Sequence, residues 1–167
     1  MIRDLLLKSR QSIVKRWIQA IVESYPQETS KFLTSSIDRF ANPVGHIISE
    51  SANQIFDEIT GGNDFNKIRS SLVDIIKIRT VQDFTPSKAV GFIFSLKRFI
   101  WEEVENEVND KNTSQELLDI EFMIDRAALI AFDLYMEAKE KLFQIHLDEL
   151  KAVILYNNRN GGIKDSK

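Results

Sequence analysis

Apolar residues recur along most of the chain every three or four positions, the spacing of one face of an α-helix. Six segments show this pattern, near residues 2–24, 27–37, 43–59, 64–80, 86–108 and 113–156. No alternation typical of a β-strand competes with it. The pattern therefore predicts an all-α protein built as a bundle of about six helices.

Residues that begin or end helices lie at the borders of these segments. Pro26 ends the first segment, and Asn42 with Pro43 has the composition of a helix start. Gly61 and Gly62 are expected to end the third helix, and Asn63 or Asp64 to cap the fourth. Further on, Thr85 is predicted to cap the fifth helix ahead of Pro86, and Thr113 to form a capping box with Glu116.

The fifth segment is apolar almost all round between Ala89 and Trp101, which predicts a helix that is buried on most sides. Gly91 lies inside it, where glycine costs about 1 kcal/mol relative to alanine. We expect the close approach of another helix to compensate for that cost.

The last segment is too long for the core of one compact domain, since about 43 helical residues span roughly 65 Å. It carries two rows of apolar residues at seven-residue spacing, as in coiled coils. We predict that its first half packs in a domain of residues 1–156 and that its second half projects as a dimerisation or relay helix. Residues 157–167 read as a polar tail. One row is Phe122, Leu129, Met136, Phe143 and Leu150, and the other is Leu117, Ile124, Ala131, Ala138 and Ile145.

The composition argues against a nucleic-acid-binding, membrane-spanning or secreted protein. The 167 residues are 43% hydrophobic, enough for one core, and their net charge of −3 offers no basic field for nucleic acid. The chain has no cysteine, no apolar run long enough for a membrane span, and no signal peptide at its start. We therefore expect a cytoplasmic protein with one helical domain.

The sequence shows no catalytic or metal-binding pattern. His46 and His146 are the only histidines and stand outside any metal-binding motif, and the two Gly-Gly pairs lack a phosphate-loop context. We expect neither an enzyme nor a bound cofactor. Because a single histidine can hold a haem iron, a haem-binding sensor stays open as an alternative.

Polar residues gather at residues 79–88, within the run 78–94 that joins two apolar helices. In one interpretation Arg79 and Asp83 form an ion pair at i, i+4 while Thr85 caps the next helix. In the other, the polar side chains line a ligand pocket or a signalling surface. The segment FANPVG, residues 40–45, admits the same two interpretations, as a helix entry or as a ligand contact.

Three pieces of the sequence resemble one known family. Trp17 with Tyr25-Pro26, the segment DRFANPVG and the segment IRTVQDFTPSKAVGFIFSLK are similar to the N-terminal domain of RsbR-type proteins, the RsbT co-antagonists of bacterial stressosomes. The resemblance covers about residues 5–155. Its most specific positions are Phe40, Asn42, Pro43, Gly45, Arg79, Val81, Gln82, Asp83, Pro86, Ser87, Ala89, Val90 and Gly91.

This resemblance implies a globin-like fold without haem and a homodimeric sensor domain whose last helix leads into a STAS domain. The chain stops at Lys167, where a STAS domain would begin, so we expect a stand-alone sensor or an excised domain. The leading hypothesis is a non-enzymatic regulatory domain that acts through dimerisation and contacts with a signalling or STAS-domain protein. The alternative is a haem-binding or small-molecule-binding globin-like sensor, with its pocket beneath helices 43–59, 64–80 and 86–108. The expected ligand or signalling surface comprises Asn42, Arg79, Gln82, Asp83 and Ser87.

Overall fold

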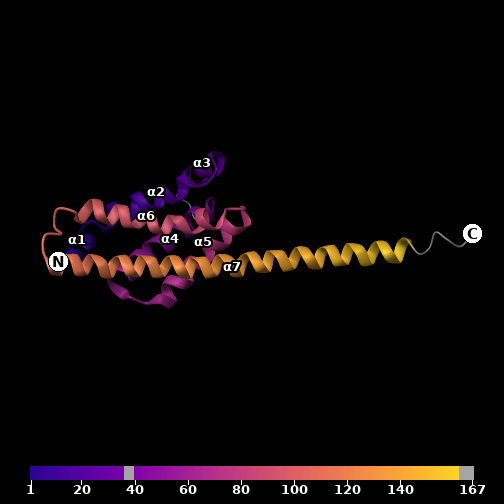
Figure 1. The fold of residues 1–167 in the computed structure, drawn as a ribbon. Coiled ribbons are helices and arrows are strands. Elements are labelled where there is room, and N and C mark those ends of the chain that lie inside the picture. Colours follow the sequence, from indigo (N-terminus) through magenta and orange to yellow (C-terminus); the bar gives the residue numbers. More distant parts are fainter. Residues whose placement is uncertain (36–39, 162–167) are drawn as a thin grey trace, which may run out of the picture.

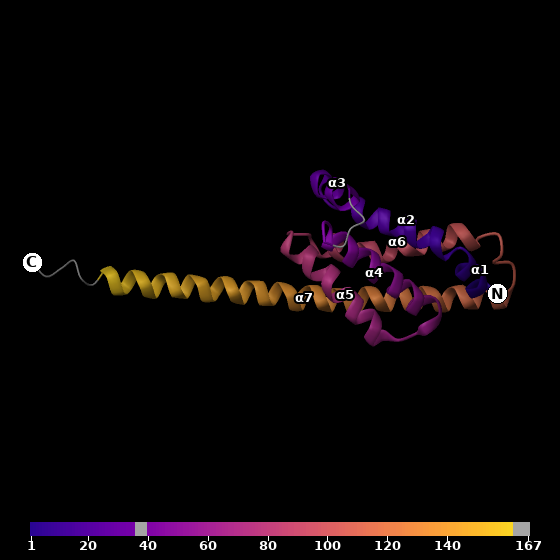
Figure 2. The same cartoon turned by 180° about the vertical axis from the view of Figure 1, so that it is seen from behind.

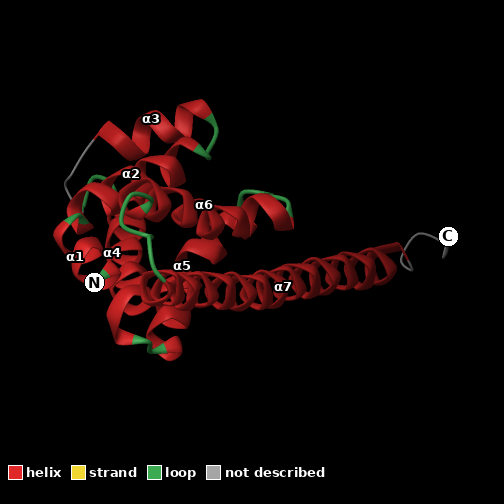
Figure 3. Ribbon diagram, turned by 60° about the vertical axis from the view of Figure 1, so that its left-hand side comes forward, coloured by secondary structure: helices red, strands yellow, loops and turns green. Residues whose placement is uncertain are grey.

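The computed structural model describes residues 1–35 and 40–161, and over these residues the chain is helical without a strand (Figure 3). The predicted all-α class is confirmed. Residues 36 and 37 of the second predicted helix, and 162–167 of the predicted tail, lie outside the described residues. The elements are α1 (Ile2–Lys8), α2 (Arg10–Glu23), α3 (Gln27–Ser35), α4 (Pro43–Asp57), the π-helical segment η1 (Glu58–Gly62), α5 (Phe65–Val81), α6 (Pro86–Val104) and α7 (Lys111–Gly161).

The bundle is arranged around the first half of α7. Helices α5 and α6 pack against α7, α4 packs against α5, and α2 lies on α4 and α6. The second half of α7 extends well beyond the other helices, and the chain's N-terminus lies near the opposite end of α7 (Figures 1 and 2). Within the described residues, no helix is long and apolar enough to cross a membrane.

The core contains the apolar faces that the sequence pattern predicts. Trp17 is fully buried in it, and its indole N–H donates a 2.8 Å hydrogen bond to the carbonyl oxygen of Phe92 while its ring stacks on Phe92. Around this pair lie side chains without solvent exposure from six helices, including Leu6, Ile13, Ile21, Ile55, Phe56, Leu72, Ile76, Ile93, Leu96, Ile124 and Ala131.

The first predicted helix is divided in two, which corrects the sequence interpretation. Ser9 separates α1 from α2, with φ −90° and ψ 4°. Serine is a weak helix former because its hydroxyl competes for backbone hydrogen bonds. The change of direction lets α1 bury Ile2 and Leu6 against α6, α7 and η1 while α2 packs on α4 and α6.

The end of α4 also differs from the prediction, because the helix continues as η1 through the two glycines. Asn63 ends it instead, in the left-handed conformation with φ 57°. Asp64 caps α5 as predicted, its carboxylate accepting from Asn66 N–H at 2.9 Å. Glu58 accepts from the Asp64 N–H and from Lys67, both at 3.1 Å, so this buried carboxylate ties η1 to α5.

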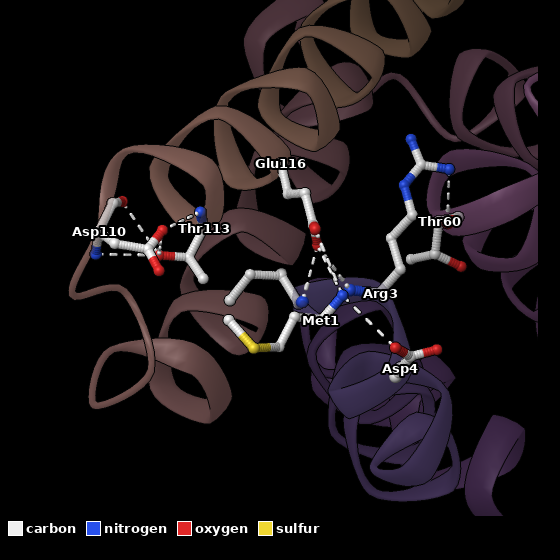
Figure 4. A network of polar contacts seen from close by, with 8 residues as sticks. Met1, Arg3, Asp4, Thr60, Asp110, Thr113 and Glu116 are labelled. Carbon is white, nitrogen blue, oxygen red and sulfur yellow. Dashed lines mark hydrogen bonds and ion pairs between the residues drawn. The ribbon is translucent and has the colours of Figure 1, made fainter.

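The start of α7 is capped three residues earlier than expected. Asp110 and Thr113 form a reciprocal capping box, with Thr113 N–H donating to the Asp110 carboxylate at 2.8 Å (Figure 4). Glu116, the predicted partner of Thr113, lies over the first turn of α1 and accepts from Ile2 N–H at 2.7 Å. The chain's first and last helices are therefore joined end to end by this carboxylate.

The two heptad rows of α7 face different surroundings. Leu117, Ile124 and Ala131 of one row are buried in the bundle. All five residues of the other row, Phe122 to Leu150, are 51–67% exposed. Tyr135 is the last buried residue of α7, and residues 136–161, named here the α7 arm, follow it. The predicted division into a packed half and a projecting half is confirmed, with the helix running past Tyr156 to Gly161.

Candidate functional site

The junction between α5 and α6 is a tight reversal of the chain. Asp83 adopts a left-handed conformation, φ 56°, which aspartate tolerates better than most residues. The N–H of Phe84 then donates to the carbonyl oxygen of Arg79 at 3.2 Å, and this returns Phe84 toward the core. Pro86 is the first residue of α6 as predicted. Thr85 is the N-cap residue as predicted, although its side chain makes no cap hydrogen bond.

Arg79 is the central polar residue of this junction and has no solvent exposure. One terminal nitrogen, Nη1, donates to the carbonyl oxygen of Lys88 at 3.0 Å. The other, Nη2, donates to Ser24 Oγ at 2.7 Å and to the carbonyl oxygen of Ile21 at 3.3 Å. Since Ile21 lies in the last turn of α2, the cation is held at the negative end of that helix. One side chain thus joins α2, α5 and α6.

Three aromatic rings enclose the same guanidinium group. Its central carbon lies 4.8 Å from the ring centroids of Tyr25 and Phe84 and 4.7 Å from that of Phe92. The first two rings meet edge to face, with centroids 5.2 Å apart. A cation over an aromatic face is stabilised by about 0.5–2 kcal/mol, so the rings offset part of the cost of burial. We call these four side chains, Arg79 and its three rings, the arginine cage.

The predicted ion pair between Arg79 and Asp83 is wrong. The left-handed turn points Asp83 outward, where its carboxylate lies 3.3 Å from Lys139 of α7. Within the described residues no carboxylate pairs with Arg79. Burial accordingly lowers the pKa of Arg79, although arginine keeps its proton in proteins. Fully buried charges without an ionic partner are rare, so this cation is the most unusual feature of the site.

Two buried polar atoms of the cage have no hydrogen-bond partner among the described residues. They are Nε of Arg79 and the hydroxyl oxygen of Tyr25. Burial raises the pKa of the Tyr25 hydroxyl, against the attraction of the Arg79 charge. A buried donor left unpaired costs about 1–3 kcal/mol. The cage is therefore incompletely satisfied by the protein itself.

The junction is attached to α7 at the point where that helix leaves the bundle. The buried hydroxyl of Tyr135 donates a 2.7 Å hydrogen bond to the carbonyl oxygen of Phe84. One turn further on, Lys139 makes its contact with Asp83 and lies 5.9 Å from the ring centroid of Tyr135. Phe84 thus belongs to the arginine cage through its ring and contacts α7 through its backbone.

A cavity of about 350 Å³ opens beside the cage, between α2, α5 and α6. We call it the junction cavity. Ser24 and Lys88 lie at its exposed mouth, and Arg79 and Phe92 form its buried wall. A neighbouring hollow of similar volume shares Ser24, Phe84 and Lys88 with it and reaches Gln82 and Asp83.

A third hollow, of about 500 Å³, lies on the other side of α6 and is almost wholly apolar. We call it the α6/α7 groove, and it is lined by Pro86, Ser87, Val90, Gly91, Phe94, Ala128, Leu129 and Phe132. Gly91 lines both this groove and the junction cavity. Apart from its chain neighbours and the backbone of its own helix, no heavy atom lies within 4 Å of the position a Cβ would take there, so the expected close approach of another helix at Gly91 is wrong.

Asn42 lies at the start of α4, where it caps the helix as predicted. Its side-chain oxygen accepts from the Gly45 N–H at 2.9 Å, and its amide donates to the carbonyl oxygen of Leu33 at 2.6 Å. A Cβ on Gly45 would overlap the Asn42 amide. The Asn-Pro-x-Gly pattern is therefore explained by the helix entry, and the ligand contact has no support from these bonds.

The five predicted site residues do not form one cluster. Arg79, Gln82 and Asp83 belong to the junction, whereas Ser87 lines the α6/α7 groove and Asn42 caps α4. Sequence reasoning missed Ser24, Tyr25, Phe84, Phe92 and Tyr135, because nothing in their local sequence shows that distant helices bring them to Arg79 or to its loop.

The two histidines lie away from the cage. His46 is half-buried on α4, 3.3 Å from Glu50, and His146 is exposed on the α7 arm. Neither lines the hollows described above. Among the described residues, no three acidic or histidine side chains are grouped as ligands for a metal ion.

Comparison with known proteins gives one match. The family model described as the RsbT co-antagonist protein rsbRD N-terminal domain matches residues 11–150. This range includes the arginine cage, the junction cavity and most of α7. No curated protein and no solved structure matches the chain, so the globin-like arrangement stays a prediction.

Proposed function

The chain belongs to the family of RsbT co-antagonist rsbRD N-terminal domains, and we propose that it is a non-enzymatic sensor domain that dimerises along α7. The family indicates a regulatory domain of the stressosome type, which signals through protein partners. Dimerisation, the route of the signal and a cytoplasmic location are the parts that we add.

The main support for dimerisation is the exposed heptad row of α7. Phe122, Leu129, Met136, Phe143 and Leu150 lie on one face of the helix over roughly 42 Å. Exposed apolar residues are ordinary when scattered, but five large ones repeated at regular spacing along one helix face indicate an interaction surface. We call these five residues the α7 stripe.

A second copy of the chain fits this surface because the spacing is that of a coiled coil. A strict seven-residue repeat over several turns favours two helices that supercoil around each other. Each large apolar side chain contributes about 1.5–3 kcal/mol when fully buried, and a dimer would bring ten of them together. The stripe also borders the α6/α7 groove through Leu129, so the interface extends from the arm onto the body of the domain.

The contacts of the junction support a relay from the cage to the arm. Arg79 packs on the ring of Phe84, whose carbonyl oxygen is bonded to Tyr135, the last buried residue of α7. A change of packing at the cage therefore acts on α7 where the arm begins. In a dimer the two arms would carry that change to a downstream protein, for which a STAS-domain partner is the expectation from the family.

The first test is the mass of the protein in solution. Sedimentation equilibrium over a wide concentration range should give twice the chain mass of 19.3 kDa. A mass of 19.3 kDa that does not change with concentration would contradict the dimer. Pull-down from the native cell, with an arm-deleted chain ending at Tyr135 as control, then tests whether the arm recruits the partner.

A further inference from the structure

A further hollow, of about 360 Å³, lies between α5 and α7 where the α7 arm leaves the bundle. We call it the α5/α7 groove. On α7 its wall extends from Leu134 in the bundle to Leu142 on the arm, so body and arm share the groove. Its α5 wall is one row of the helix surface, with a lining residue every four positions at Arg69, Val73, Lys77 and Val81.

The floor of the groove is apolar and only partly covered. Leu134 is buried in the bundle, whereas Leu142, about two turns further along α7, is half-buried. The difference arises because α5 ends at Val81, which is itself 68% exposed. Apolar side chains that continue beyond the helix that covers them are typical of a surface for another helix.

The rim of the groove carries cations that the described part of the chain does not neutralise. Lys77 on α5 and Lys141 on α7 are exposed, and neither forms an ion pair within residues 1–35 and 40–161. Arg69 is 2.9 Å from Glu137, the one carboxylate among the described lining residues. The lining therefore has a charge of +2 in a chain whose net charge is −3.

We propose that the α5/α7 groove binds an acidic amphipathic helix of a partner protein. The apolar residues of that helix lie on Val73, Val81 and Leu142, and its aspartate or glutamate side chains pair with Lys77 and Lys141. A helix that lays its apolar face in a groove uses residues at i, i+3, i+4 and i+7. The charge of the rim selects an acidic helix, since a basic one would bring like charges to both lysines.

The groove and the α7 stripe lie on opposite faces of α7. Leu134 and Ala138, two positions before and after Met136 of the stripe, point about 160° away from it at roughly 100° per residue. A dimer along the stripe therefore leaves the groove open. The inference rests on the proposed role as a domain that signals through protein partners, but not on the dimer. It places the partner beside the contact of Asp83 with Lys139, where the arm begins.

The test begins with a selection of helical peptides against the full chain. The display library holds alanine-based peptides of about 18 residues, five helical turns, with random residues on one face and its flanks. We expect the enriched peptides to carry apolar residues at i, i+3 or i+4 and i+7, and more aspartate and glutamate than lysine and arginine. Fluorescence anisotropy of one enriched peptide, labelled with fluorescein, then gives its affinity.

Paired substitutions locate the bound peptide. Lys77→Glu with Lys141→Glu should weaken binding about tenfold or more, because two attractive charges become repulsive. Lys15→Glu with Lys111→Glu reverses two exposed lysines outside the groove and should change the affinity by less than about twofold in physiological salt. Leu142→Glu puts a charge in the apolar floor and should abolish binding, with circular dichroism to confirm equal helix content.

The stripe variant Phe143→Glu separates this inference from the dimer. It should bind the peptide as tightly as the wild type does, whatever its mass in solution. The proposal is overturned if no peptide is enriched, if the enriched peptides lack the acidic excess, or if the two lysine pairs have equal effects. Phosphatidylglycerol vesicles that bind through Lys77 and Lys141 while no peptide is enriched would assign the groove to a membrane and also overturn it.

Discussion

Tyr135 and Phe84 are joined by a buried 2.7 Å hydrogen bond, from the tyrosine hydroxyl to the phenylalanine carbonyl oxygen. These residues are 51 positions apart in the sequence. Phe84 belongs to the loop that closes the arginine cage, and Tyr135 is the last buried residue before the α7 arm. The bond therefore directly connects the proposed sensory site to the proposed output helix.

Removing this bond should destabilise the domain. Tyr135→Phe keeps the ring but leaves a buried carbonyl oxygen without its donor, which costs about 1–3 kcal/mol. Urea unfolding followed by circular dichroism measures the change. Tyr156→Phe is the matched control, because Tyr156 is 67% exposed on the arm and its substitution should change stability by less than about 0.5 kcal/mol. Equal effects of the two substitutions would show that the Tyr135 bond adds nothing.

Arg79 and Asp83 should behave as independent residues. Arg79→Met removes a buried cation bonded to three groups and is expected to cost about 3 kcal/mol or more, since those polar groups lose their partner. Asp83→Asn keeps a residue that tolerates the left-handed conformation and should cost less than about 1 kcal/mol. A double-mutant cycle measured by urea unfolding should give a coupling free energy near zero. A coupling free energy of about 1 kcal/mol or more would show that Arg79 and Asp83 do form the ion pair that the sequence spacing predicts.

Two glycine-to-alanine substitutions should have opposite signs. Gly91→Ala adds a methyl group where no other helix or side chain lies within 4 Å, apart from its chain neighbours, so its better helix propensity should raise stability by up to about 1 kcal/mol. Gly45→Ala places a Cβ against the Asn42 amide and should displace the helix cap, at a cost of about 1 kcal/mol. Thermal unfolding of both variants beside the wild type measures the difference. A Gly91→Ala protein that unfolds below the wild type would refute the open space at that position.

Acid should weaken the connection between α1 and α7. Burial alone would raise the pKa of Glu116, but hydrogen bonds from the Met1 ammonium group and the N–H groups of Ile2 and Arg3 outweigh it, and the pKa lies below its ordinary value. A carboxyl group whose pKa is lowered by folding stabilises the protein above its unfolded pKa, near 4.3, and this contribution is lost as the pH falls through the folded pKa.

Glu116→Gln should therefore lose stability at pH 7 and show a shallower decline than the wild type between about pH 5 and pH 3. Urea unfolding at several pH values measures both slopes. Glu149→Gln, an exposed carboxyl on the α7 arm, serves as control and should follow the wild type. Parallel slopes for wild type and Glu116→Gln would mean that the carboxylate is not linked to folding.

Local sequence signals predicted much of the fold. Asn42 and Asp64 cap their helices, and Pro86 begins its helix, because these roles depend on neighbours within three residues. The heptad rows of α7 were also visible, since the period of a helix is a property of the sequence. The exposed row is the feature on which the proposed dimer rests.

The candidate site could be predicted only in part, because its partners are distant in sequence. Arg79 was identified, but its acceptors Ser24 and Ile21 lie 55 and 58 residues away, and the spacing to Asp83 suggested a different partner. The left-handed turn points the Asp83 carboxylate toward Lys139, so Arg79 bonds to the distant acceptors and not to Asp83. Likewise, Glu116 was assigned to Thr113 three residues before it, whereas it caps α1 at the other end of the chain.

The dimer along the α7 stripe is the central claim, and paired charge substitutions on the α7 arm test it most directly. Phe143 and Ile145 are 64% and 52% exposed and lie about 200° apart around the same helix, so only Phe143 belongs to the stripe. Sedimentation equilibrium of the wild type, Phe143→Glu and Ile145→Glu, with circular dichroism to confirm equal helix content, is the decisive measurement. We predict that Phe143→Glu sediments as a monomer while the wild type and Ile145→Glu remain dimers. A dimer that survives Phe143→Glu, or one that both substitutions dissociate equally, would contradict the stripe as the interface.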